Sequence, residues 1–167
     1  MRQPIVLLSF GALLLSAPLV ASAQGAKSTR APAPTMEALI KATGEAYKIS
    51  ASGSVKWYVV TLVSNGKGAS VGLSEDRDWL GQAGLAKGRL EIQLISLSAA
   101  PTAQLLKAVA AFNNKLPYGS VIVDETGAYY VHDFIMNGLT ADVLGTEIGA
   151  AFYLSQAATK EFSAYIE

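Results

Sequence analysis

The residues of this chain that could do chemistry are few and widely separated. His132 is the single histidine, and Asp133 follows it directly. Adjacent residues of a strand point to opposite faces, so these two side chains cannot form a local acid–base pair. Glu91 and Asp133 could meet in space as the two carboxylates of a glycoside hydrolase, but their spacing does not predict it. We therefore expect a protein that is not an enzyme, in which His132 is an ordinary strand residue.

Metal and cofactor sites have equally little support. The chain contains no cysteine, and one histidine without cysteine does not make a zinc site. Three carboxylates fall within 75–78, but Arg77 lies among them and the alternating spacing of a calcium-binding loop is missing. We interpret this segment as a solvated acidic turn. No phosphate-binding loop or dinucleotide-binding glycine pattern occurs, so we predict no metal and no cofactor.

Basic and acidic residues are balanced. The chain has 13 Lys and Arg against 13 Asp and Glu, so its formal net charge is zero. No cluster of basic residues predicts binding to a phosphate backbone, and we expect no nucleic-acid partner. Weak repulsion between copies also makes self-association easier than for a strongly charged domain.

The first residues predict the location of the protein. Arg2 precedes an almost wholly apolar run, and the small residues Ala21-Ser22-Ala23 follow it. A basic start, an apolar core and an Ala-x-Ala site are typical of a secretory signal peptide, here 1–23 with cleavage after it. Pro18 disfavours the alternative of an uncleaved membrane anchor, and the missing cysteine excludes a lipid anchor. We expect a periplasmic or secreted protein with no stable membrane insertion after cleavage.

A single domain is predicted after the signal peptide. Residues 24–34, with two prolines among small and polar residues, indicate a flexible tether. The folded part is expected to span 35–166, which is long enough to bury a core without disulfides. Its hydrophobic periods predict an α+β fold, with an antiparallel sheet of about five strands flanked by three helices in the order α-β-β-β-α-β-β-α.

Caps, breakers and hydrophobic periods predict the individual elements. Helices are expected from Thr35 to Gly44, from Pro101 to Pro117, and from Thr140 onward. Two-residue periods predict strands at 46–49, 55–63, 89–97, 120–123 and 128–135, and 69–73 could return as the partner of 55–63. Asn65-Gly66 is the strongest hairpin signal, and we interpret Gly66, Gly68 and Gly72 as residues of that hairpin.

Two connecting segments carry their own expectations. The segment 75–88 lacks a sustained period, so we interpret it as a long loop or irregular helix at one edge of the sheet. The run Asp124-Glu125-Thr126-Gly127 predicts a turn in which the glycine takes a positive φ.

Several of these segments resemble the YbjN-like family. The resemblance is carried by Phe112-Asn113-Asn114-Lys115-Leu116-Pro117-Tyr118-Gly119, by Val123-Asp124-Glu125-Thr126-Gly127 and by Gly138-Leu139-Thr140. Leu39, Gly44 and Tyr47 are similar to the first helix and strand of the family. The family is labelled as bacterial sensory transduction regulators, and its fold is similar to that of class I type III secretion chaperones, which are small α+β dimers. The resemblance implies this fold and supplies no catalytic residues.

Two features of the chain depart from that family. The predicted signal peptide means that a cytosolic export-chaperone role does not transfer. The segment 75–88 also looks like an insertion.

The outer face of the last helix is the best candidate for a partner surface. Its residues carry only two charges: Asp142, Thr146, Gly149, Tyr153, Gln156 and Lys160. A helix that is weakly polar on its outer side often has a partner there. We predict a partner surface at Tyr153, Gln156, Lys160 and Tyr118, for a protein or peptide partner or for a second copy in a homodimer.

Different classes of function remain open at this point. We expect a secreted, non-enzymatic protein that binds a protein or peptide partner in a regulatory or chaperone-like role. One alternative is a small periplasmic hydrolase, which would need His132 beside a carboxylate in a deep pocket. Another is a small-ligand-binding module with an aromatic-lined pocket. Its wall could include Trp57, Tyr58, Tyr129 and Tyr130, although packing within the sheet explains these residues better.

Overall fold

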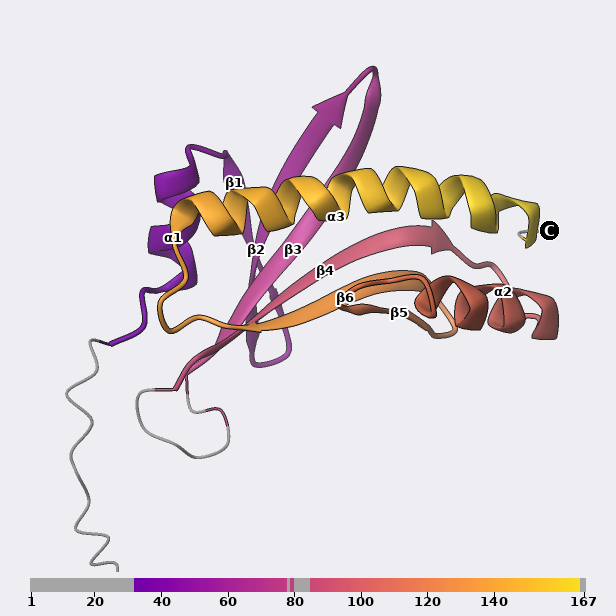
Figure 1. Ribbon diagram of the computed structural model, residues 1–167, viewed down its shortest axis with the longest axis horizontal. Helices are drawn as coiled ribbons and strands as arrows, with labels where there is room; N and C mark the ends of the chain where they lie inside the picture. Colours follow the sequence, from indigo (N-terminus) through magenta and orange to yellow (C-terminus); the bar gives the residue numbers. More distant parts are fainter. Residues whose placement is uncertain (1–31, 78, 80–84, 166–167) are drawn as a thin grey trace, which may run out of the picture.

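One antiparallel sheet and three helices form the part of the chain that the computed structural model describes, residues 32–77, 79 and 85–165 (Figure 1). The strands are β1 (Tyr47–Ser52), β2 (Val55–Ser64), β3 (Lys67–Asp76), β4 (Lys87–Ser96), β5 (Ser120–Val123) and β6 (Gly127–Ile135). The helices are α1 (Met36–Thr43), α2 (Ala103–Asn113) and α3 (Ala141–Phe162), and a short 3-10 turn (Ser163–Tyr165) follows α3. The predicted signal peptide, 1–23, and most of the predicted tether lie outside the described residues. Within these residues, no helix combines the length and the apolar character needed to cross a bilayer.

The α+β class and the antiparallel sheet are confirmed, but the predicted number of strands was wrong. The sheet has six strands in the spatial order β1-β2-β3-β4-β6-β5, and the chain order is α-β-β-β-β-α-β-β-α. The strand missing from the predicted order is β3. Its glycine and serine residues weaken the two-residue hydrophobic period by which a strand is recognised. The loop predicted at 75–88 was also wrong at both ends, because Glu75 pairs with Gly88 and Asp76 with Lys87 in the β3–β4 ladder.

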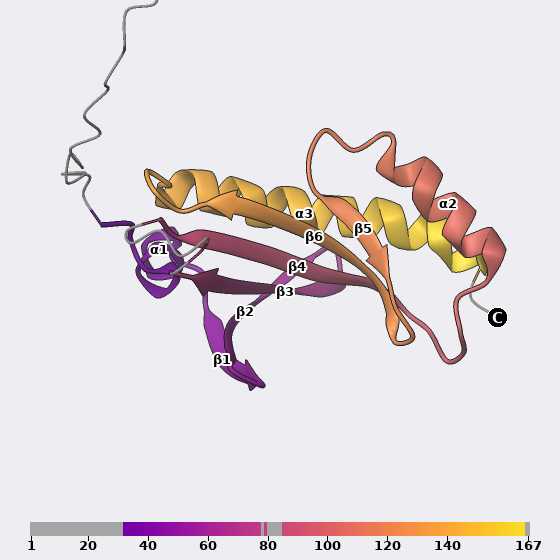
Figure 2. The ribbon, with the colours of Figure 1, turned by 90° about the horizontal axis from the view of Figure 1, so that it is seen from below.

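Helix α3 crosses the sheet on its inner face, above β3 and β4, and α1 packs beside its N-terminal half (Figures 1 and 2). The face of α3 that packs on the sheet is a mostly apolar stripe of buried residues: Leu144, Ile148, Ala151, Phe152, Ser155, Ala158 and Phe162. They lie against buried sheet residues that include Val60, Val71, Leu73, Leu90, Ile92 and Tyr130. Thr140 begins the helix as predicted, because its side chain accepts a hydrogen bond from the N–H of Val143.

The opposite, open face of the sheet has no described helix against it. Trp57 of β2 lies on this face, and its indole ring rests on the backbone of β3 at Gly72. A Cβ atom at Gly72 would lie 3.1 Å from the ring, so the missing side chain lets the indole lie close to the sheet. Gly72 therefore shapes the surface of the sheet, in addition to its predicted place in the hairpin.

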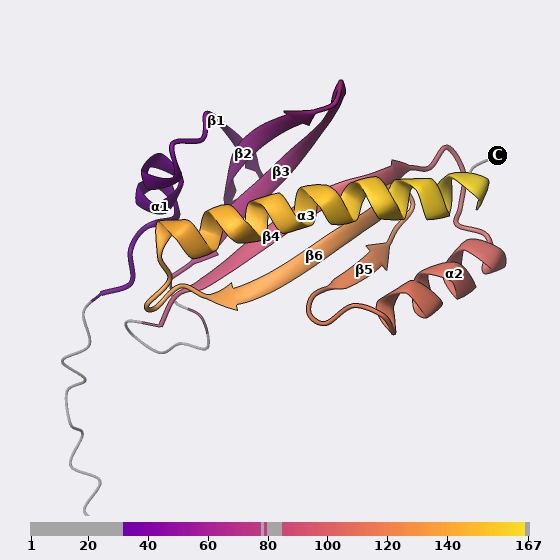
Figure 3. The same cartoon turned by 45° about the horizontal axis from the view of Figure 1, so that its top comes forward.

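The β2–β3 hairpin separates from β4 and extends past α3 (Figure 3). Pairing between β3 and β4 begins only at Val71 and Ile92, whereas β2 and β3 pair as far as Ser64 and Lys67. The predicted turn is confirmed, because Asn65 and Gly66 have φ values of 52° and 74°, as a two-residue hairpin of the primed type requires.

A bulge in β4 fixes the position of the far half of α3. The register with β6 shifts between Gln93 and Ile95, so the intervening Leu94 has no partner in that ladder. The Leu94 carbonyl instead accepts a hydrogen bond from Thr159 Oγ1 of α3 over 2.8 Å. The positive φ predicted for Gly127 was wrong. A Cβ atom there would lie 2.3 Å from the Ile95 carbonyl oxygen, so close approach to the bulged strand explains the glycine.

Candidate functional site

A groove runs between the tip of the β2–β3 hairpin and the second half of α3. It consists of two adjoining hollows of about 600 and 270 Å³, which share Lys67 and Gln156. The larger is closed on its far side by Gln93 and Leu94 of β4, and the smaller is bordered by Tyr153. We call this site the α3 groove. It exists because the hairpin leaves β4 while the Thr159 hydrogen bond holds α3 against β4.

The α3 groove is polar and positively charged. Its lining residues include two lysines, Lys67 and Lys160, and no Asp or Glu. Neither lysine forms an ion pair with any residue that the structure describes. Tyr153 is 71% exposed, which is unusual for a large aromatic side chain. The groove therefore offers two uncompensated positive charges beside an exposed ring.

The structure brings together three of the four residues of the predicted partner surface. Tyr153, Gln156 and Lys160 all line the α3 groove, and whether they bind a partner stays a prediction. Tyr118 lies elsewhere, with its ring 5.0 Å from that of His132 on β6. Lys67 was not predicted as part of this surface. Its Asn-Gly turn was recognised, but the approach of that turn to α3 depends on the splay of the hairpin.

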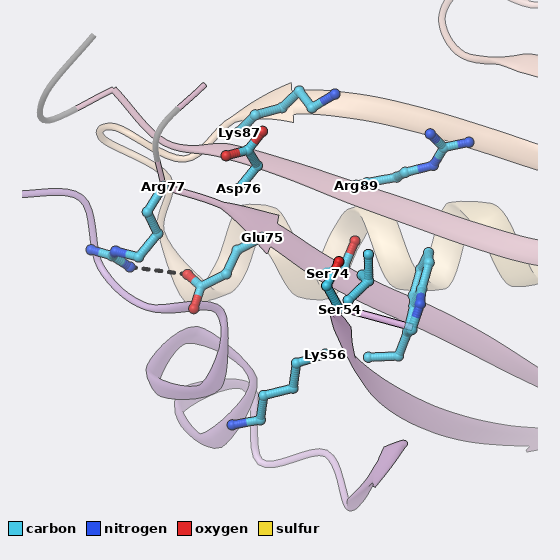
Figure 4. Close-up of a pocket in the computed structure, with 10 residues that line it drawn as sticks. Ser54, Lys56, Ser74, Glu75, Asp76, Arg77, Lys87 and Arg89 are labelled. Carbon is cyan, nitrogen blue, oxygen red and sulfur yellow. Dashed lines mark hydrogen bonds and ion pairs between the residues drawn. The ribbon is translucent and has the colours of Figure 1, made fainter. Parts of the chain in front are cut away.

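A second hollow, of about 610 Å³, lies at the other end of the sheet, between the start of β2, the end of β3 and the start of β4 (Figure 4). Its described lining residues are Ser54, Val55, Lys56, Trp57, Ser74, Glu75, Asp76, Arg77, Lys87 and Arg89. We call it the open-face hollow. The interpretation of 75–78 as a solvated acidic turn was wrong for Glu75, whose carboxylate accepts hydrogen bonds from the Met36 N–H (3.1 Å) and from Arg77 (3.0 Å). Glu75 thereby satisfies a free N–H at the start of α1.

The four aromatic residues named as a possible pocket wall divide between the two faces. Tyr58 and Tyr130 are buried beneath the helices, and burial, with smaller effects of Tyr118 and Glu147, raises the pKa of Tyr130 to about 12. Trp57 and Tyr129 lie on the open face and line a shallow hollow of about 230 Å³. Packing within the sheet therefore accounts for two of the four, and an open surface for the other two.

His132 meets a carboxylate, but not in the geometry of a general base. Its Nε2 lies 3.9 Å from Glu147 Oε2 of α3, which is longer than a hydrogen bond. Its ring packs between Tyr118 and Phe134, at centroid distances of 5.0 and 5.7 Å. It lines none of the four hollows described above. The surroundings of His132 are those of a packed side chain.

The carboxylates Glu91 and Asp133 both lie on the open face, but each faces a cation. Glu91 Oε2 lies 3.6 Å from Arg89 Nε, and Asp133 Oδ2 lies 3.4 Å from Lys87 Nζ. Basic residues on β4 thus neutralise both members of the pair. This arrangement does not resemble two carboxylates that flank a glycosidic bond.

Gly68-Ala69-Ser70-Val71-Gly72 has the Gly-x-Ser-x-Gly spacing of a hydrolase nucleophile, so our expectation that the sequence lacks this motif was wrong. In such enzymes the serine lies on a sharp strand-to-helix turn. Ser70 instead lies within β3, and its hydroxyl is 3.3 Å from that of Thr61 across the β2–β3 ladder. Ser70 and His132 also point to opposite faces of the sheet, so they cannot act together.

No group of three or more potential metal ligands gathers within the described ranges. Comparison of the chain with protein-family models and with curated proteins finds no match. The resemblance to the YbjN-like family therefore rests on the quoted segments alone and stays a prediction.

Proposed function

We propose that this protein is a secreted, non-enzymatic binding protein that holds a protein or peptide partner in the α3 groove. The observation that carries the proposal is the meeting of Tyr153 with the unpaired Lys67 and Lys160 between a hairpin and a helix. Exposed aromatic rings supply much of the binding energy at protein interfaces, and unpaired charges supply orientation. A regulatory or chaperone-like role follows from the resemblance to the YbjN-like family and to type III secretion chaperones.

Self-association belongs to the same proposal. The exposed face of α3, with its unpaired lysine charge, could bind a second copy of the chain. The resemblance to type III secretion chaperones, which are dimers, supports this possibility. The hydrolase alternative has less support, because His132 is packed between two rings and Ser70 lies on the other face of the sheet.

The proposal is tested by placing a photo-reactive amino acid at position 153 of the mature protein in the cell envelope. Position 143 is the matched control, since Val143 lies on the same helix, is 48% exposed and does not line the groove. We expect a discrete adduct from position 153 that weakens in the Lys67→Glu variant. An adduct of twice the chain mass would identify a homodimer. Equal adducts from both positions, or none from position 153, would contradict the proposal.

A further inference from the structure

Two neighbouring polar side chains of the open-face hollow make no hydrogen bond in the described part of the chain, and one of them has a buried donor atom. Ser74 is only 6% exposed, and its hydroxyl has no hydrogen bond with any described residue. Arg89 Nε is shielded from solvent and has no acceptor within hydrogen-bond distance, since its nearest carboxylate oxygen, Glu91 Oε2, lies 3.6 Å away. Ser74 and Arg89 are directly paired across the β3–β4 ladder, so both groups belong to one spot in the hollow. A buried donor without an acceptor is costly, and proteins rarely retain one without a use.

The other cations of the hollow are already engaged. Arg77 binds Glu75 and the Ala33 carbonyl, at 3.0 and 2.8 Å. Lys56 lies 3.4 Å from Glu37 of α1, and Lys87 lies 3.4 Å from Asp133. In Figure 4 the Glu75–Arg77 pair lies at one end of the hollow and Arg89 at the other. Arg89, which faces Glu91 without a hydrogen bond, is therefore the basic group of the hollow that can still donate hydrogen bonds to a ligand.

The geometry points to a binding site for a small carboxylate with a flat apolar body. A guanidinium matches a carboxylate through two parallel hydrogen bonds, and the Ser74 hydroxyl can donate a third. Trp57 lines the same hollow, and its ring rests close against β3 over Gly72, so it offers a flat apolar wall beside the polar end. A volume of about 610 Å³ is within the range of small-molecule sites.

The charge around the site favours a single negative charge on the ligand. Glu75 and Asp76 line the hollow and Glu91 lies beside Arg89, so the negative charge of these carboxylates would repel a phosphate dianion more strongly than a carboxylate. This site is separate from the α3 groove, and it develops the small-ligand alternative that the sequence left open.

The test uses benzoate as the probe and its neutral analogue benzamide as the control ligand. The folded mature protein, labelled with ¹⁵N, is titrated while the Nε–H signal of Arg89 is followed; the Arg89→Lys variant assigns that signal. We expect saturable binding of benzoate with a shift of this signal, and no response to benzamide. Arg89→Leu should weaken benzoate binding about tenfold or more, as loss of a charged hydrogen-bond pair implies.

Ser74→Ala separates a binding role from a structural one. It removes an unpaired buried hydroxyl, so the free protein should be as stable as the wild type or more so, while benzoate binds about threefold to tenfold more weakly. Lys107→Leu, on the exposed side of α2, is the matched charge control and should leave benzoate affinity unchanged. Absence of saturable benzoate binding to the wild type would overturn the proposal, as would equal affinity in Arg89→Leu.

A carboxylate can come from a free molecule or from the end of a peptide. Titration with a tripeptide that ends in phenylalanine, with a free and with an amidated C-terminus, distinguishes these sources. Tighter binding of the free-carboxylate tripeptide than of benzoate assigns the site to peptide ends, and the reverse assigns it to free molecules. Because neither Arg89 nor Ser74 lines the α3 groove, the cross-linking result at position 153 is independent of these outcomes.

Discussion

The side-chain amide of Asn113 makes hydrogen bonds with both main-chain groups of one residue, Val121. Its Nδ2 donates to the Val121 carbonyl over 2.9 Å, and its Oδ1 accepts from the Val121 N–H over 2.7 Å. Val121 lies on β5, one of the two edge strands, so these two groups point to where a further strand would pair. The last residue of α2 thus occupies the position of a neighbouring strand.

Substitution of Asn113 should therefore destabilise this edge of the sheet. We expect Asn113→Ala to lower the free energy of unfolding by about 1–3 kcal/mol, because two main-chain groups lose their partners. Urea unfolding monitored by circular dichroism measures the change. The exposed neighbour Asn114 is the control, and Asn114→Ala should change stability by no more than about 0.5 kcal/mol. Equal effects of the two substitutions would show that the Val121 contacts contribute nothing.

Two glycines should respond to alanine in opposite directions. A Cβ atom at Gly88 of β4 would lie 2.2 Å from the Phe134 ring, whereas one at Gly149 of α3 would meet nothing within 4 Å. We expect Gly88→Ala to cost about 1–3 kcal/mol through overpacking, and Gly149→Ala to gain up to about 1 kcal/mol of helix stability. Thermal unfolding measures both. Adding Phe134→Leu should recover part of the Gly88→Ala loss, and a lack of recovery would argue against the ring contact as its cause.

Stability should fall in acid through Glu37 of α1. Hydrogen bonds from Lys41, Tyr47 and Lys56 lower the pKa of Glu37 from 4.5 to about 2. A carboxyl group with a lowered folded-state pKa contributes stability above its unfolded pKa and loses it as the pH falls through the folded value. The contribution of Glu37 is thus complete above about pH 4.5 and is lost toward pH 2.

Thermal unfolding between pH 6 and pH 2 tests this expectation. The wild type should lose more stability across that range than Glu37→Gln. Glu45 is exposed and has no ion pair among the described residues, so Glu45→Gln should follow the wild-type curve. Parallel curves for all three proteins would assign the acid sensitivity to other carboxylates.

His132→Ala should affect stability but not partner binding. The ring contacts of His132 with Tyr118 and Phe134, and a side-chain exposure of 16%, lead us to expect a loss of about 1–3 kcal/mol. Cross-linking from position 153 should persist in the folded variant. Its loss in both His132→Ala and His132→Phe, with folding retained, would revive the hydrolase alternative.

The sequence predicted those structural features that depend only on neighbouring residues, such as helix caps, tight turns and buried helix faces. Thr35 and Thr140 cap their helices, Asn65-Gly66 forms the tight turn, and the stripe of α3 is buried as its period indicates. By contrast, the apolar side chain of Leu106 on α2 is 47% exposed. Helix α2 covers only the edge of the sheet, so its buried face is narrower than that of α3. The sequence of α2 alone does not show how much of its apolar face will be covered.

The candidate sites depend on contacts between distant parts of the chain. Ser74 and Arg89 look like ordinary strand residues until the β3–β4 register places them side by side. Glu75 reaches Met36 across 39 positions, and Thr159 reaches Leu94 across 65. No periodicity within one segment contains this information. Tyr153 could be recognised because helix geometry alone places it on the outer face of α3.

The two edges of the sheet set a limit on assembly. On the outer side of β1 no described residue forms a hydrogen bond with its main chain, whereas Asn113 already occupies the β5 edge. Two copies could join their β1 strands into one continuous sheet, and both ends of that sheet would then carry an Asn113 side chain. Edge-to-edge growth would stop at two copies, so the arrangement permits a pair while it blocks a fibre.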